Sequence, residues 1–423
     1  MRPRLLFAAL LCLLIFPAQS AFSQVPGASP AARPDFRLRA LRTEFENELT
    51  GNILPFWIEY SVDPSGGFYG AVQADGTPVK RESKGSVLNA RILWSFSVAY
   101  QRYGLGGYKK IADRAADYIL RHFIDPRYGG VYWSVDADGN MLDGTKHTDA
   151  QTYTIYALAE HYAATGNKES LEAAIGLFRA LQEHAHDSEK GGWTDLFARD
   201  WSLPAENRSA GRRVANTYIH IVEACTSLYR VWPEDEVRVA LEELVDTFNN
   251  RFYNPETRHY YNYCDADWKP VAASEGFGLD IEASWLVGEG AKALGDEARL
   301  ARANEISLAL LGSALSEGLT ADGALKTSHS ARGLSGGYEW WPQCEAIIGC
   351  TNAWQLTGEE KYLDAARGIW DYVKAHFVDP VGGGWFKTLR DDGTPTGAPK
   401  ISQWNCPYHN TRLCYEMISR LSR

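Results

Sequence analysis

The sequence lacks a surplus of basic residues, and no hydrophobic run beyond its first twenty residues suggests a membrane span. Its 423 residues contain 43 Lys and Arg against 53 Asp and Glu, which gives a formal net charge of −10 at pH 7. Nucleic acids and anionic membranes are bound by clustered Lys and Arg. Neither is therefore expected as a partner, and a neutral or weakly polar substrate is favoured.

Motifs for a metal ion or a nucleotide are also missing. The histidines show no close, regular spacing with carboxylates or with one another, which is the usual pattern of a zinc site. No Gly-rich phosphate loop precedes a predicted helix, and no dinucleotide fingerprint occurs. The sequence thus predicts neither a metal nor an organic cofactor.

Cysteine is scarce, with seven residues in the chain. Cys12 lies in the apolar run at the N-terminus, and the others are Cys225, Cys264, Cys344, Cys350, Cys406 and Cys414. An even number in an exported chain permits disulfides, but several of these cysteines lie inside apolar helical patterns. Buried free thiols are the prediction for most of them.

The N-terminus has the features of a secretory signal. Arg2 and Arg4 precede an apolar run from Leu5 to Phe16, and Ala18-Gln19-Ser20 offers small residues for cleavage. The run is too short to span a bilayer comfortably. We interpret residues 1–20 as a signal peptide and residues 21–34 as a flexible leader, and we expect an exported protein, periplasmic or secreted, without a membrane segment after cleavage.

A loop with aromatic residues around Gly-Gly recurs along residues 35–423. Its first copy reads SGGFYGAVQADGTP, and the fifth is reduced to LTADGAL. The copies are centred on residues 67, 130, 192, 259, 322 and 384, so that they follow one another at intervals of 62 to 67 residues. Six copies at a nearly fixed interval indicate six structural repeats.

Two helical patterns lie between successive loops. One helix pair cannot bury both of its faces, whereas a ring of six pairs closes without an exposed end. The sequence therefore predicts an all-α protein, an (α/α)6 barrel of six inner and six outer helices with short β-hairpin loops at one rim. An open α-solenoid for protein binding is the alternative, and the aromatic loops favour the barrel.

Polar side chains recur at one position of the six units. In five units this position lies thirteen residues before the predicted end of a helix, and in the sixth it falls within NCPYHNTRLCYEM. The six residues are Arg91, Tyr153, His220, Glu282, Glu345 and His409. Corresponding positions of a closed ring face the same axis, so we expect these residues to form one polar pocket, which is the predicted functional site.

The titratable members of this set suggest acid–base chemistry. His409 has a side chain that can take up and return a proton near neutral pH. His220 shares a helix face with Asn216, four residues earlier, although a lone buried histidine is as often structural. Glu282 and Glu345 could each simply interact with the positive end of a helix dipole. Burying both beside two histidines is costly unless they are paired, and Arg91 is a natural partner or a donor to a sugar hydroxyl.

Aromatic residues point to a carbohydrate substrate. The chain has 14 Trp and 22 Tyr, and flat aromatic faces pack against the C–H faces of sugar rings. Candidates for such stacking are Tyr153, Trp340, Trp341 and Trp404, each of which could equally serve plain packing.

Four motifs together resemble the N-acylglucosamine 2-epimerase family, and within it the cellobiose and mannose 2-epimerases. They are ANTYIHIVEA, GLDIEASWL, WWPQCEA and WNCPYHNTR. The resemblance implies the same barrel and a cofactor-free inversion at C2 of a reducing sugar through a cis-enediol. By position it makes His409 one of two bases. It further implies that His220 assists ring opening and stabilises the enediol, that Glu282 orients the partner base, and that Asn216, Arg91 and Glu345 bind the sugar.

The chain departs from the family pattern at the second base. Family members usually read His-Asp-Ile-Glu where this chain has Leu279-Asp280-Ile281-Glu282. Leucine cannot transfer a proton, so a one-base reaction that moves the proton between C2 and C1, aldose–ketose isomerisation, becomes an alternative. Asp280, Glu282 or His329 could also substitute. A second departure is Asn405, where many relatives have Lys.

Three functions follow from these patterns. The first is an exported epimerase or isomerase of a free reducing sugar, acting as a monomer or homodimer. The second is a glycoside hydrolase or lyase that uses Glu282 and Glu345 as paired carboxylates, because six-unit helical barrels also host such enzymes. The third, suggested by Leu279, is a sugar-binding relative without catalysis.

Overall fold

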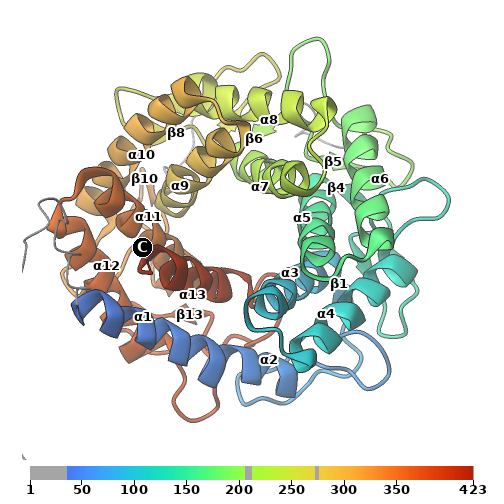
Figure 1. Cartoon of the computed structure of the whole chain (residues 1–423), viewed down its shortest axis with the longest axis horizontal. Helices are drawn as coiled ribbons and strands as arrows, with labels where there is room; N and C mark the ends of the chain where they lie inside the picture. Colours follow the sequence, from blue (N-terminus) through green and yellow to red (C-terminus); the bar gives the residue numbers. More distant parts are fainter. Residues whose placement is uncertain (1–35, 205–211, 272–275, 423) are drawn as a thin grey trace, which may run out of the picture.

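The computed structural model describes residues 36–204, 212–271 and 276–422. They form two concentric rings of helices (Figure 1). The inner ring comprises α3 (Ser86–Tyr103), α5 (Thr148–Thr165), α7 (Ala215–Val231), α9 (Phe277–Leu294), α11 (Trp340–Thr357) and α13 (Tyr408–Arg420). The predicted signal peptide and leader, residues 1–20 and 21–34, lie outside the described residues.

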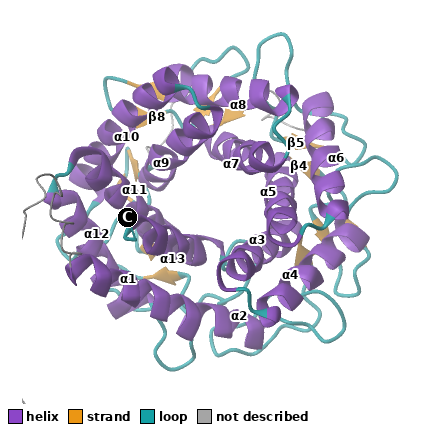
Figure 2. Ribbon diagram, viewed as in Figure 1, coloured by secondary structure: helices purple, strands orange, loops and turns teal. Residues whose placement is uncertain are grey.

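The outer ring covers the inner one, as the two purple layers in Figure 2 show. It comprises α1 (Phe36–Glu48), α2 (Leu54–Tyr60), α4 (Gly106–Tyr118), α6 (Lys168–His184), α8 (Asp235–Thr247), α10 (Glu297–Gly318) and α12 (Glu360–Tyr372). Short π-helical segments follow four of these helices: η1 (Leu49–Ile53), which joins α1 to α2, η2 (Ile119–Phe123), η3 (Phe248–Phe252) and η4 (Val373–Phe377).

The ring closes between its last and first units. Each inner helix packs against the next, and α13 packs against both α3 and α1. An open solenoid would leave α3 and α13 apart, so that alternative is wrong and the predicted (α/α)6 barrel is confirmed. Every helix within the described ranges is too short or too polar to cross a membrane.

The sequence explains why inner and outer helices differ. Along α3 every residue from Ser86 to Ser97 is buried, because the inner helices contact neighbours on all sides. Outer helices such as α12 bury one face, with Leu363, Ala366 and Trp370 inside. Four inner helices end at a glycine in the left-handed conformation, Gly104, Gly166, Gly295 and Gly358, which stops the helix and starts the turn to the outer layer.

Short strands gather at the rim where the inner helices begin. Four pairs link the segment before an inner helix to a neighbouring hairpin: β1 (Lys84–Gly85) with β2 (Ser134–Val135), β4 (Lys146–His147) with β5 (Leu196–Phe197), β6 (Arg213–Val214) with β9 (Tyr263–Cys264), and β12 (Tyr338–Glu339) with β13 (Thr388–Leu389). The other strands are β3 (Met141–Asp143), β7 (Tyr253–Asn254), β8 (His259–Tyr260), β10 (His329–Ser330) and β11 (Gly333–Leu334).

All six predicted hairpin loops are present, including the degenerate fifth copy. That copy is closed by a bridge between Leu319 and Leu325, which corresponds to Val62 with Phe68 in the first. Buried ion pairs join several of these loops to the segment before an inner helix. Examples are Lys84 with Asp63 at 2.7 Å and Lys146 with Asp125 at 3.0 Å. These contacts fix the inner-helix starts, from which the functional side chains project.

The six cysteines in the described residues are all free and buried. The prediction of buried thiols is therefore confirmed for them.

Candidate active site

A cavity of about 280 Å³ lies at the rim end of the inner ring. Eight of the nine predicted site residues line it: Arg91, Tyr153, Asn216, His220, Glu282, Trp341, Trp404 and His409. The ninth, Glu345, is fully buried and lies behind His409. Trp340 also lines the cavity, as do Glu339 and Lys387, which were not predicted as site residues.

The inner helices bring these residues together by a shared register. Arg91, Tyr153, His220, Glu282 and Glu345 are each the sixth residue of their helix. His409 is the second residue of α13, which begins later than the other inner helices, after Pro407. Side chains that lie a little over one turn from the start of each helix therefore form one layer around the axis.

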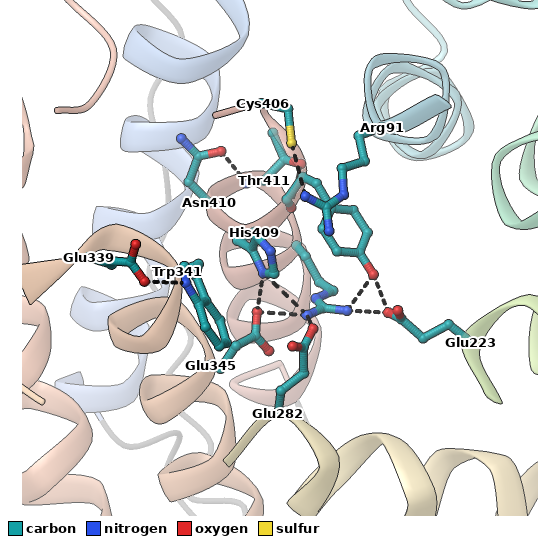
Figure 3. Close-up of polar contacts among 12 residues, drawn as sticks. Arg91, Glu223, Glu282, Glu339, Trp341, Glu345, Cys406, His409, Asn410 and Thr411 are labelled. Carbon is teal, nitrogen blue, oxygen red and sulfur yellow. Dashed lines mark hydrogen bonds and ion pairs between the residues drawn. The ribbon is translucent and has the colours of Figure 1, made fainter. Parts of the chain in front are cut away.

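His409 is held by a carboxylate on its buried side. Its Nδ1 lies 2.8 Å from Glu345 Oε1 (Figure 3). Burial lowers the pKa of His409 well below 6.5, while the charge of Glu282 acts in the opposite direction. A neutral imidazole that donates its Nδ1–H to Glu345 leaves Nε2 unprotonated. His409 therefore offers the cavity a free base.

His220 has a matching arrangement. Its Nδ1 lies 2.7 Å from Oε2 of Glu223, one turn later on the same helix. Burial disfavours the charged form of Glu223 and by itself raises its pKa. The interactions with Arg412 and His220 outweigh this effect and lower the pKa of Glu223 to about 2. The ring of Tyr153 lies 4.5 Å from the His220 ring, centroid to centroid. The imidazole is thus fixed by an ionised carboxylate and by an aromatic neighbour.

Arg412 connects the acidic groups beneath the cavity. Its guanidinium bonds to Glu282 at 2.5 Å, to Glu345 at 2.7 Å, and to Glu223. It also lies over the rings of Tyr408 and Trp285, at 4.4 and 5.0 Å. One buried cation therefore serves three buried carboxylates from three helices.

Two groups of side chains have the chemistry of metal ligands. They are His220 with Glu223 and Glu282, and Glu282 with Glu345 and His409, each with potential ligand atoms within 4.8 Å of one another. These are the residues that could hold a divalent ion. Arg412 already supplies positive charge to the three glutamates, so an ion would have to displace a guanidinium that is bound to them.

Arg91 lies on the cavity wall with spare donors. It donates to the hydroxyl of Tyr153, its guanidinium lies 4.1 Å from the Tyr153 ring centroid, and Nη1 lies 3.5 Å from Cys406 Sγ. Its Nε is buried and has no hydrogen-bond partner in the described residues, whereas Nη1 and Nη2 each carry a second N–H group and the residue lines the cavity. The guanidinium can therefore bind the oxygens of a substrate or the charge that forms on one.

The residues proposed to replace the missing base do not all reach the cavity. Asp280 is turned away from it and accepts hydrogen bonds from His259 Nδ1 at 2.7 Å and from the Tyr260 amide at 2.8 Å. His329 is exposed on β10. Neither residue, nor Leu279, which is 6% exposed, is among the lining residues, whereas Glu282 is. Asn405 holds its own loop by donating to the carbonyls of Pro399 and Lys400.

Two tryptophans shape the mouth of the cavity. Trp341 donates from Nε1 to Glu339 Oε2 at 2.9 Å, and its ring lies 5.7 Å from that of His409. It packs against α9 because Gly278 has no side chain; a Cβ there would meet the indole at 2.3 Å. Trp404 is 40% exposed. The Trp341 wall of the cavity is thus packed against α9, and the Trp404 wall is open to solvent.

The missed residues Glu339 and Lys387 come from the rim. Glu339 occupies the N-cap position of α11, although its side chain makes no capping hydrogen bond. It stands immediately before the WWPQCEA motif, so the sequence did place it beside Trp341. Lys387 belongs to a hairpin, and its backbone carbonyl accepts a hydrogen bond from the Trp340 amide. Nothing in its local sequence indicates this long-range pairing.

Comparisons with known proteins agree with this geometry. The family model described as N-acylglucosamine 2-epimerase matches residues 67–411. A cellobiose 2-epimerase of Bacteroides fragilis is 38% identical over 391 residues, which cover 89% of this chain and 98% of that protein. A D-mannose isomerase of Marinomonas mediterranea is 22% identical over 385 residues, covering 87% and 95%. The structure of cellobiose 2-epimerase from Bacillus thermoamylovorans superposes with a TM-score of 0.87 at 33% identity, covering 90% and 100%.

Proposed function

This chain belongs to the N-acylglucosamine 2-epimerase family, and on that premise we propose that it rearranges a free reducing sugar at C1 and C2 through a cis-enediol. It is a carbohydrate epimerase or isomerase, as are the relatives named above. The observation that carries the proposed mechanism is the free Nε2 of His409 on the cavity wall, with Nδ1 held by Glu345.

His409 takes the proton from C2 of the open-chain sugar. The C2–H electron pair forms the C1=C2 bond, and the carbonyl electron pair moves to O1. Arg91 lines the same cavity and stabilises the charge on O1 by hydrogen bonds that strengthen as the charge develops. Transfer of the O2 proton to O1, together with return of the abstracted proton from His409 to C1 on the same face, gives the ketose. Delivery of a proton to the opposite face of C2 gives the epimer and requires a second acid.

The substrate class follows from the relatives and from the mouth of the cavity. Relatives at 32–38% identity are cellobiose 2-epimerases, which supports a sugar with glucose or mannose configuration at its reducing end. The exposed ring of Trp404 offers a surface on which a second sugar unit can stack outside the cavity.

The hydrolase alternative is disfavoured by the positions of its two carboxylates. Glu345 does not line the cavity, and both Glu282 and Glu345 are bound to Arg412. Paired carboxylates of a glycosidase must both reach the scissile bond, whereas here two histidines reach that space. The non-catalytic alternative depends on Leu279 and is decided by the same experiment as the leading proposal.

The test is solvent exchange in heavy water. Cellobiose, glucose, mannose and fructose are incubated separately with the purified protein, and C1 and C2 are followed by NMR. We expect deuterium at C2 of at least one sugar. In His409→Asn the rate at which that sugar is converted to its epimer or ketose should fall by about 100-fold or more, the usual contribution of a general base. His329→Asn, which alters an exposed histidine outside the cavity, serves as the matched control and keeps the parent rate.

If none of the four sugars reacts, catalysis is contradicted and a binding protein is favoured. Release of glucose from cellobiose without exchange at C2 favours the hydrolase.

The site of action is part of the same proposal. The N-terminal Arg2, Arg4 and the apolar run that follows support export of the chain. N-terminal sequencing of the protein recovered outside the cytoplasm is expected to begin after Ser20. Recovery of the intact chain from the cytoplasm contradicts export.

A further inference from the structure

His220 and His409 stand on opposite walls of the inner ring. The inner helices contact one another in the order α3, α5, α7, α9, α11, α13 and back to α3. Helices α7 and α13 are therefore three places apart in either direction, and Figure 1 shows them on opposite sides of the hole. Leu279 belongs to α9, which is two places from α13.

The two imidazoles are held in the same way. In each, Nδ1 is bonded to a glutamate, at 2.7 Å for His220 and at 2.8 Å for His409. In each, Nε2 has no partner among the described residues, and both rings line the cavity. No other histidine within the described ranges lines it. The chain thus carries two oriented imidazoles facing one space from opposite sides.

We propose that His220 is the second acid–base group of the reaction, positioned by Glu223, and that the chain inverts C2 despite the leucine at position 279. The inference rests on the proposed function, because it needs the same enediol. It departs from the family pattern, which implies that His220 assists ring opening and assigns the second proton transfer to a histidine at position 279.

The proton balance is complete with these two groups. Neutral His409 takes the C2 proton, and the electron pair of the broken C–H bond moves through C1 to O1. Protonated His220 then delivers its proton to the opposite face of C2, the O1 electrons reform the carbonyl, and the C2 epimer results. His409 ends protonated and His220 neutral, which is the state required for the reverse reaction.

Glu282 provides a route for resetting the two histidines. Ring nitrogens of His220 and of His409 each lie within 4.8 Å of a Glu282 oxygen. A proton can therefore pass between the two walls through this carboxylate and water in the cavity, without leaving the site.

The test uses two variants and both epimers of the best substrate in heavy water. A second base and an aid to ring opening differ in one respect: a base acts on the epimer whose C2 hydrogen faces it, whereas ring opening precedes the reaction of both. We expect His409→Asn and His220→Asn each to lower epimer interconversion by about 100-fold or more. Each variant nevertheless retains deuterium exchange at C2 of one epimer, and the retained epimer differs between them.

Glu223→Gln is the positioning variant. It keeps the shape and a hydrogen-bond acceptor for His220 but removes the negative charge. We expect it to reduce exchange only from the epimer that His220→Asn loses, and to move the pH profile of that half-reaction. Circular dichroism melting verifies that each variant is folded, and mutarotation measured by NMR reports ring opening separately.

Four results decide the outcome. Reciprocal loss of exchange supports the proposal. Equal loss on both epimers with slowed mutarotation in His220→Asn overturns it and leaves the ring-opening role. A parent protein that forms only the ketose also overturns it but leaves the enediol mechanism standing, whereas absence of any exchange in the parent removes the proposed function itself.

Discussion

Arg412 and Glu345 form a buried ion pair, with 2.7 Å between Nη2 and Oε1, beneath the imidazole of His409. The same guanidinium bonds to Glu223, which holds His220. Both histidines of the cavity are therefore oriented through glutamates that share one arginine. This makes Arg412 a positioning residue for both walls of the site.

Replacement of Arg412 by methionine tests this role. The substitution leaves three buried glutamates without their common cation, and breaking a buried ion pair typically costs about 3–5 kcal/mol. We expect a loss of that order in the free energy of unfolding, measured with urea, together with a fall in kcat. Arg420→Met is the matched control. It removes another arginine of α13 that bonds to Glu416 at 2.9 Å, and it should leave kcat near the parent value.

The pH dependence of activity tests the state of His409. Burial lowers the pKa of His409 below 6.5, so the neutral base persists into mildly acidic solution. We expect the acid-side fall in kcat/KM to lie below pH 6.5. In Glu282→Gln the charge that raises the pKa of His409 is gone, and the fall should move to still lower pH. A fall centred above pH 6.5 in the parent contradicts this assignment.

The same shift predicts a change in stability with pH. The folded pKa of His409 lies below the unfolded value near 6.5, so the unfolded chain binds the proton more readily. The stabilising contribution is present above pH 6.5 and is lost as the pH falls towards the folded pKa. Urea unfolding of the parent and of His409→Asn measures it: the difference between the two should shrink as the pH is lowered.

The sequence was sufficient for the barrel and for one layer of the site. Six repeats of nearly equal length place equivalent residues around one axis, which is why Arg91 and His409, far apart in the chain, could be predicted to face one cavity. The next layer was missed, although it has the same register. Three residues after each member of the predicted set lie Trp94, Tyr156, Glu223, Trp285, Ile348 and Arg412.

That second layer contains the residues that orient the two histidines of the first layer. A residue three positions later lies one turn deeper on the same helix face, so Glu223 and Arg412 were accessible to the same reasoning. The pattern does not tell which of these residues pair, because the pairing of Arg412 with Glu223 and Glu282 depends on how three helices approach one another. Lys387 was out of reach for a related reason: the pairing of β12 with β13 brings it to the cavity, and such pairing is not encoded locally.

The exposed Trp404 is expected to act in substrate binding. Its ring lines the cavity but is 40% open to solvent. In Trp404→Ala we expect KM to rise by about 2- to 10-fold for a disaccharide, because a stacked aromatic contact contributes about 0.5–1.5 kcal/mol. The value of kcat should change little. Trp232→Ala, which removes a partly buried tryptophan near Arg179 and outside the cavity, is the control and should keep the parent KM.

The buried thiols should be unreactive in the native protein. Burial raises the pKa of Cys225 and Cys350 to about 12, and that of Cys344 and Cys414 well above 9. The thiolate is the reactive form, so alkylation at pH 8 should leave these four peptides unmodified until denaturant is added, as followed by mass spectrometry. A reducing agent should leave the melting temperature unchanged. Rapid labelling of any of the four contradicts their burial.

The last prediction concerns the departure at position 279. If His220 supplies the second proton, then a histidine at the family position should replace it. Helix α9 adjoins α7 in the ring, and residue 279 lies one turn before Glu282, so an imidazole there approaches the sugar from the side that His220 serves. We therefore expect Leu279→His, placed in His220→Asn, to restore the lost exchange at C2 by about 10-fold or more, a part of the usual contribution of a general base.

The control for this rescue is Leu279→Asn in the same background, which fills similar space with a side chain that does not exchange protons in this pH range. Because it cannot supply the proton, the lost half-reaction should stay lost, and mutarotation should be the same in both double variants. Equal recovery with asparagine and histidine means that the volume at position 279, and not the proton, limits the reaction. Recovery of both half-reactions together with mutarotation means that His220 assists ring opening, because a base on one face of C2 cannot restore exchange from both epimers.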